Sequence, residues 1–207
     1  MVEMPPIPER MASLPRDDRS YPIPYFVAMI NGKPEFRLAS AQKLYLCVEE
    51  KRCWCCGQTL DPKQHAFVIG PTQTITRLNP EPPNHVECAE FAAMACPFLT
   101  KPKAQRREAD KPPSFTVEGQ IDRNPGVCAI WVCRGYSVTR TTGGVVFEMP
   151  NPSRVKWFAE ARKATRSEIM ESFEELFPIL RSQAPTEKSL LMLGQAITKA
   201  LKFVPAA

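Results

Sequence analysis

The sequence predicts an α+β protein with a treble-clef zinc module in its N-terminal half. Two pairs of candidate zinc ligands, each with its members three residues apart, are Cys53 with Cys56 and His85 with Cys88. A hairpin pattern lies between the pairs and a helix pattern begins at the second pair, which is the order of knuckle, hairpin and helix in a treble clef. Further along the chain, strand patterns followed by amphipathic helix patterns indicate a small β-sheet with C-terminal helices.

A proline-rich arm, a hairpin and a helix are predicted before the first ligand pair. Residues 1–24 are rich in proline and polar residues, so we interpret them as an extended arm laid over a surface. Strand patterns flank Asn31 and Gly32, and Asn-Gly is the strongest short-range hairpin signal. Ser40 can cap the helix that follows. This flanking hairpin and helix lead the chain into the cysteine knuckle.

The segment after the knuckle completes the predicted zinc module. Strand patterns at 66–69 and 74–78 predict a hairpin. Asn84 is the expected N-cap of a helix over residues 85–95, whose first turn presents the second ligand pair on one face. We therefore assign residues 25–99 to a zinc-binding treble-clef domain.

The C-terminal half is predicted to be a separate α+β region. Residues 100–125 are rich in Lys, Arg and Pro without periodicity and are predicted to be a linker. Residues 126–207 form the α+β region. Its predicted elements are strands at 127–133 and 145–149, a turn region at 136–144, and helices capped by Thr165 and Thr186.

Composition is typical of a globular protein in a reducing compartment. Hydrophobic residues make up 43% and charged residues 24% of the chain, so a buried core is expected. We find neither a secretory signal nor an apolar segment of ~20 residues, and we therefore expect a cytoplasmic protein that binds no membrane. The eight cysteines are then expected to be thiols and metal ligands. The net charge of +5 permits nucleic-acid binding without specifying it.

Cys53, Cys56, His85 and Cys88 are the predicted ligands of one Zn²⁺ ion, the cofactor that we expect. Zinc accepts thiolate and imidazole in a tetrahedron. The Cys-x-x-Cys-Gly turn places two sulfurs on one side of a tight loop, in which Gly57 permits a positive φ. Four protein ligands leave no open position for a substrate, so we expect a structural site.

Cys55 and Cys96 are the competing candidates. Adjacent Cys55 and Cys56 cannot both present their sulfurs comfortably to one ion, so we interpret Cys55 as an exposed bystander. Cys96 lies about two helical turns after Cys88 and is expected to pack under the helix. It would be the substitute ligand if His85 were not one.

A metal-dependent, HNH-like nuclease is the alternative function. Nucleases with a ββα-metal core also use treble clefs and need a hairpin histidine as general base, and His65 is the one histidine outside the ligand set. No Asp-His pair and no second metal-binding histidine accompany it, which favours a surface histidine. His85 and Glu87 match half of a zinc-deaminase signature, but its Pro-Cys-x-x-Cys half does not follow. We therefore predict no catalytic residue.

Several runs of residues resemble a family of uncharacterised bacterial, phage and prophage proteins. These runs are LPRD at 14–17, YPIPYFV at 21–27, CWCCG at 53–57, FVIGP at 67–71, PPNHVECAEF at 82–91, ACPFL at 95–99, NPGV at 124–127 and ATR at 164–166. The family pattern has valine at the position of Cys55, which agrees with a bystander role. The resemblance implies a phage- or prophage-associated origin and no particular activity.

From these observations we expect a phage-type accessory protein that acts by binding, with a zinc-finger-like structural site. If it is phage-encoded, its location is the host cytoplasm. Its partner would be a protein or a nucleic acid, and the residues do not decide between them.

Overall fold

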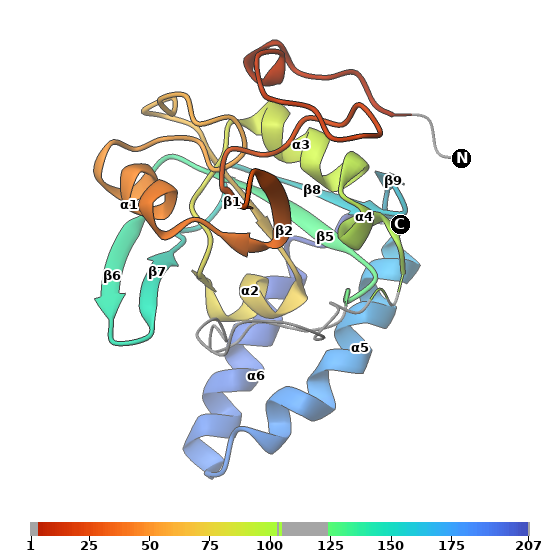
Figure 1. The fold of residues 1–207 in the computed structure, drawn as a ribbon. Helices are drawn as coiled ribbons and strands as arrows, with labels where there is room; N and C mark the ends of the chain where they lie inside the picture. Colours follow the sequence, from red (N-terminus) through yellow and green to blue (C-terminus); the bar gives the residue numbers. More distant parts are fainter. Residues whose placement is uncertain (1–3, 103, 105–123, 207) are drawn as a thin grey trace.

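A four-stranded antiparallel sheet lies at the centre of the structure, a computed structural model that describes residues 4–102, 104 and 124–206 (Figure 1). Most of the predicted linker, 100–125, lies outside the described residues. The elements are, in chain order, η1 (Glu9–Met11), β1 (Val27–Ile30), β2 (Lys33–Ala39), α1 (Ala41–Glu49), β3 (His65–Ile69), α2 (Pro71–Thr76), β4 (Leu78–Asn79), α3 (Val86–Ala95), α4 (Pro97–Thr100), β5 (Cys128–Cys133), β6 (Ser137–Thr141), β7 (Gly144–Glu148), β8 (Arg154–Ala159), β9 (Arg162–Lys163), α5 (Arg166–Ser182) and α6 (Glu187–Leu201).

The central sheet has the strand order β3-β5-β8-β9 and is covered on both faces. Successive side chains of a strand point to opposite faces. On β5, Ile130 therefore packs under α3, whereas Trp131 packs with residues of α2, α5 and α6. Cys128 and Cys133 lie on opposite faces, as their spacing predicts. The α+β class is confirmed.

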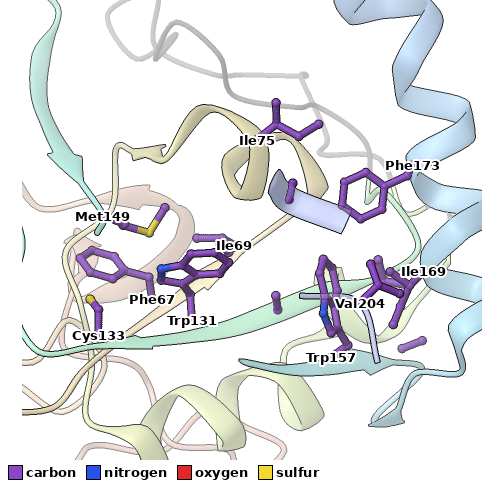
Figure 2. Close-up of a cluster of buried hydrophobic side chains, with 14 of the residues drawn as sticks. Phe67, Ile69, Ile75, Trp131, Cys133, Met149, Trp157, Ile169, Phe173 and Val204 are labelled. Atoms are coloured by element: carbon purple, nitrogen blue, oxygen red, sulfur yellow. The ribbon is translucent and has the colours of Figure 1, made fainter. Parts of the chain in front are cut away.

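The largest of the three clusters of buried hydrophobic residues lies between the sheet and the helices α2, α5 and α6. Figure 2 shows Phe67 and Trp131 side by side on the sheet, and Phe173 of α5 beside Trp157. Trp131 is fully buried, and its indole Nε1 donates a hydrogen bond to the carbonyl oxygen of Pro150 at 3.0 Å. This core is made largely by residues from the C-terminal half of the chain.

The predicted hairpin between the two ligand pairs is wrong. Residues 66–69 lie in β3, but residues 74–78 do not pair with it, because the chain enters α2 at Pro71. Gln73 Oε1 accepts a hydrogen bond from Gly70 N at 3.0 Å, and proline is pre-organised for the first turn of a helix. These local contacts favour a helix where alternation predicted a strand.

β3 pairs instead with β5, so one sheet contains strands from both halves of the chain. What remains of the treble-clef hairpin is one isolated antiparallel bridge between Ala66 and Asn84, directly before α3. The knuckle and the helix are therefore present, but the pairing partner of β3 comes from the predicted C-terminal region.

The predicted turn region at 136–144 contains a strand. β6 pairs with β7, and β7 pairs with β4 to complete a three-stranded sheet. The predicted strands at 127–133 and 145–149 therefore lie in different sheets, and β8, which we did not predict, lies beside β5. Every residue of β6 is exposed, so this strand has no alternation of buried and exposed side chains to reveal it.

The hairpin and helix before the knuckle are confirmed. β1 and β2 pair around Asn31 and Gly32, whose φ values of 51° and 76° are the left-handed conformation that a tight hairpin turn needs. Ser40 caps α1 through a hydrogen bond that its side chain accepts from Lys43 N.

Both C-terminal helices begin at the predicted caps. In α5, Thr165 Oγ1 accepts a hydrogen bond from Glu168 N, and Glu168 Oε2 accepts one from Thr165 N at 2.7 Å. Thr186 caps α6 in the same manner, and α5 continues through Pro178 to its end. Within the described part of the chain, no helix has the length and apolarity needed to cross a bilayer.

Glu168→Gln is expected to lower the free energy of unfolding at neutral pH by about 0.5–1 kcal/mol. Hydrogen bonds from Arg162, and then from the Thr165 backbone, lower the pKa of Glu168 to about 2. Because this pKa lies below the unfolded value of 4.5, the stabilisation is present above that pH and is lost as the pH falls through about 2. In urea unfolding at several acidic pH values, the wild type should lose more stability than the variant. Equal losses would contradict this role for Glu168.

Candidate metal centre

The four predicted ligands converge at the N-terminal end of α3. Cys53 and Cys56 lie in the knuckle after α1, His85 is the N-cap residue of α3, and Cys88 lies in its first turn. Their four ligand atoms, one from each residue, all lie within 4.8 Å of one another. None of the four residues is more than 7% exposed. The structure thus brings the whole predicted ligand set together in a buried position.

The separations between the ligand atoms are close to those around a tetrahedral zinc ion. With Zn–S bonds of about 2.3 Å and Zn–N bonds of about 2.0 Å, ligand atoms around one ion lie roughly 3.5–3.8 Å apart. His85 Nδ1 lies 3.4 Å from Cys56 Sγ. An inward movement of about 1 Å by the most distant pair would close the set around an ion.

His85 is oriented for metal binding by the knuckle itself. Its Nε2 lies 3.0 Å from the carbonyl oxygen of Thr59. A carbonyl oxygen only accepts, so Nε2 donates this hydrogen bond and Nδ1 is the ring nitrogen left to face a metal ion. A metal-bound histidine commonly donates its other ring N–H to such an acceptor, which fixes the tautomer and the ring orientation.

The backbone of the knuckle also supports the sulfur atoms. The amide nitrogens of Cys56 and His85 lie 3.5 Å and 3.4 Å from Cys53 Sγ and donate to it. Gly57 has a φ of 76°, and a Cβ atom there would lie 2.5 Å from Cδ2 of Tyr25. Both the turn and the close approach of the Tyr25 ring therefore require glycine.

The pattern of pKa shifts indicates that the cluster suits a cation. Hydrogen bonds with Cys53 and Cys88 lower the pKa of the Cys56 thiol, whereas contacts with Cys53 and Cys56 raise the pKa of Cys88. Burial opposes the charged form of His85, but the neighbouring Cys53 and Cys56 outweigh it and raise the pKa of His85 to about 10. The cluster therefore retains protons to balance thiolate charge, and a divalent cation can take their place.

Asn84 supports the site in a way that the sequence analysis missed. We predicted it as the N-cap of α3, but His85 holds that position. Asn84 Oδ1 accepts a hydrogen bond from Cys55 N at 2.9 Å, and its Nδ2 donates to the carbonyl oxygen of Ala66 at 3.4 Å. Asn84 thus joins the knuckle to β3. The position of Asn84 directly before His85 indicates that it lies near the site. The sequence does not show which groups its side-chain amide contacts.

Asn84→Ala is expected to reduce metal affinity about 10–100-fold and to cost about 1–3 kcal/mol of stability. The substitution leaves the buried amide of Cys55 without its acceptor. Asn79→Ala is the matched control, because Asn79 is also a buried amide but donates to Glu81 in a neighbouring loop. Competition with a chromophoric chelator should distinguish them, and equal metal affinities would contradict this role for Asn84.

The prediction that Cys55 is exposed is wrong. Cys55 is 3% exposed and packs with Met11, Leu60 and Phe91. Burial, and then the nearby thiols of the cluster, raise its pKa well above the ordinary value. Neither Cys55 nor Cys96 belongs to the group of converging ligand atoms in the described residues.

His65 is buried at the start of β3, so the prediction of a surface histidine is also wrong. Its ring packs edge-on against Tyr136 with the centroids 5.0 Å apart, and burial lowers its pKa. Across the residues that the structure describes, the Cys₃His cluster is the one group of three or more Cys, His, Asp or Glu side chains close enough to hold a metal ion. His65 is not part of that group.

Comparisons with protein-family models, with curated proteins and with solved structures found no match. The resemblance to phage and prophage proteins therefore stays an expectation. What this chain can do is inferred from the Cys₃His group and its surroundings.

Proposed function

We propose that Cys53, Cys56, His85 and Cys88 bind one structural Zn²⁺ ion. The observation that carries this proposal is the convergence of their four ligand atoms within 4.8 Å in a buried position. Thiolate and imidazole suit zinc, whereas Ca²⁺ and Mg²⁺ prefer oxygen ligands. Four protein ligands would complete a tetrahedron, so no position would remain for a substrate.

The ion would fix the knuckle to the N-terminal end of α3. That helix packs on β3, β5 and β8 and so covers one face of the central sheet. Because the binding free energy of a structural zinc ion is folding free energy, the metal would support both the knuckle and this layer of the fold.

Elemental analysis of the untagged, reduced protein tests the metal proposal. We expect one zinc per chain, and replacement by Co²⁺ should give the absorption of a tetrahedral ion with thiolate ligands. A Cys55→Ala protein should keep both properties. A folded wild-type protein that carries no zinc and takes up none would overturn the proposal.

We infer further that the protein is an accessory protein that acts by binding a macromolecular partner, of the phage or prophage type that the resemblance implies. The described surface favours a protein over a nucleic acid. Four large apolar side chains on α5 and α6 are between 44% and 65% exposed, namely Ile179, Leu190, Leu191 and Met192. Several arginines that could contact phosphate are paired with carboxylates, namely Arg10, Arg19, Arg37, Arg52, Arg140 and Arg162.

Two measurements separate the partner classes. A protein partner should give a stoichiometric complex that can be rebuilt from the two purified components. A nucleic-acid partner should instead give an affinity for DNA or RNA that falls steeply with salt, since each neutralised phosphate releases counterions. Tight, salt-dependent binding of nucleic acid without any stable protein complex would reverse our preference.

A further inference from the structure

The N-terminal arm is seated on the candidate metal centre. The short turn η1 places Met11, which is 1% exposed, in a buried cluster with the three cysteine ligands. Ile7 and Leu14 of the arm pack against the same cluster. Figure 1 shows the arm, in red, passing across α3. The arm therefore packs directly against the cysteines of the candidate site.

Arg10, next to Met11, contacts both halves of the candidate site. Its Nε donates to Glu87 Oε1 at 2.8 Å, and Glu87 lies between His85 and Cys88 on α3. Its Nη1 lies 3.3 Å from Gln58 Oε1, and Gln58 Nε2 donates to the carbonyl oxygen of Arg10 at 3.2 Å. Gln58 follows the Cys-x-x-Cys-Gly turn directly. The arm thus bridges the two segments that the metal would hold together.

The charge of Arg10 complements that of a loaded site. Three thiolates and a neutral imidazole around Zn²⁺ carry a net charge of −1, and a buried charge is costly unless it is balanced. The bond to Glu87, and more weakly the charges of Cys56 and Cys88, raise the pKa of Arg10. The Arg10–Glu87 pair is nearly half exposed, so it contributes little alone, and Met11 is the main anchor.

We propose that arm residues 7–14 form a lid on the metal centre, and that lid docking and metal binding are coupled. This inference rests on the proposed zinc site. Met11 and Arg10 dock on a surface that the knuckle and α3 form together. The bound metal would fix these two segments relative to each other and so would maintain that surface. By linkage, the docked lid must then stabilise the bound metal to the same extent. The lid also separates the sulfur atoms from solvent and chelators.

Transfer of zinc from the intact, loaded protein to a chromophoric chelator tests the lid. Met11→Ala should speed metal release about 10–100-fold, the range seen when a residue that supports metal ligands is removed. Arg10→Gln should speed it by a smaller factor. Arg19→Gln is the matched control, because Arg19 lies in the same arm but pairs with Asp17. Its release rate should equal that of the wild type.

The effect of zinc on docking of the arm gives a second measurement that does not depend on the release rate. Backbone amides of residues 7–14 should be protected from hydrogen exchange in the zinc-loaded protein and should lose that protection after chelation. Arm protection that is the same with and without zinc, or a Met11→Ala protein that releases zinc at the wild-type rate, would overturn the lid. A wild-type protein without zinc would instead overturn the proposed site, so the two failures are distinguishable.

Discussion

Replacing Cys88 with serine is expected to release the metal ion and to unfold the knuckle together with α3. Structural zinc contributes about 10–16 kcal/mol in small zinc-binding peptides, which is comparable with the whole stability of a typical domain, about 5–15 kcal/mol. Because α3 covers Ala66 and Ile130 on the central sheet, the loss should extend beyond the knuckle. Zinc content after gel filtration and thermal unfolding followed by circular dichroism measure both effects.

Cys55→Ala is the control for this substitution. Cys55 is buried beside the site but lies outside the group of ligand atoms. Its replacement removes one buried sulfur and should cost about 1–2 kcal/mol while the zinc content stays at one per chain. A Cys88→Ser protein that keeps its zinc and unfolds at the wild-type temperature would show that the ligand set is wrong.

Trp131→Ala is expected to lower the free energy of unfolding by about 3–5 kcal/mol. Trp131 is fully buried at the middle of β5, and the guanidinium of Arg77 lies 4.0 Å from its ring centroid. The variant would leave a large cavity and remove the hydrogen bond to Pro150. Urea unfolding measures the loss. Val138→Ala, on the exposed strand β6, should change stability by no more than about 0.5 kcal/mol.

Trp131→Ala also tests whether the metal centre and the central sheet unfold together. Phe67 of β3 is paired with Trp131 of β5, and β3 is the first strand after the knuckle. We therefore expect zinc release and loss of the sheet to shift to lower urea concentration by the same amount. Zinc release at the wild-type urea concentration would mean that residues 25–99 unfold as an independent domain, as the predicted boundaries imply.

The sequence by itself determined those features that depend on neighbours along the chain. The convergence of the four candidate ligands follows from two short spacings, one on a tight turn and one on the first turn of a helix. The hairpin at Asn31 and the helix caps at Ser40 and Thr165 likewise follow from residues within a few positions of one another. In these elements the hydrogen bonds join residues close together in the chain, so they depend little on the rest of the fold.

Tertiary structure alone decided which strands pair and what covers the site. β3 ends at Ile69 and β5 begins at Cys128, and every residue of β5 is buried, so no alternation of buried and exposed residues specifies its partner. Cys55 was predicted to be exposed because it adjoins Cys56, and His65 because no partner of a nuclease site accompanies it, yet packing against Met11 and Tyr136 buries them. The arm has no periodicity, so its contact with the metal centre could not be read from its pattern. These features depend on contacts between residues far apart in the chain, whose free energy no local pattern encodes.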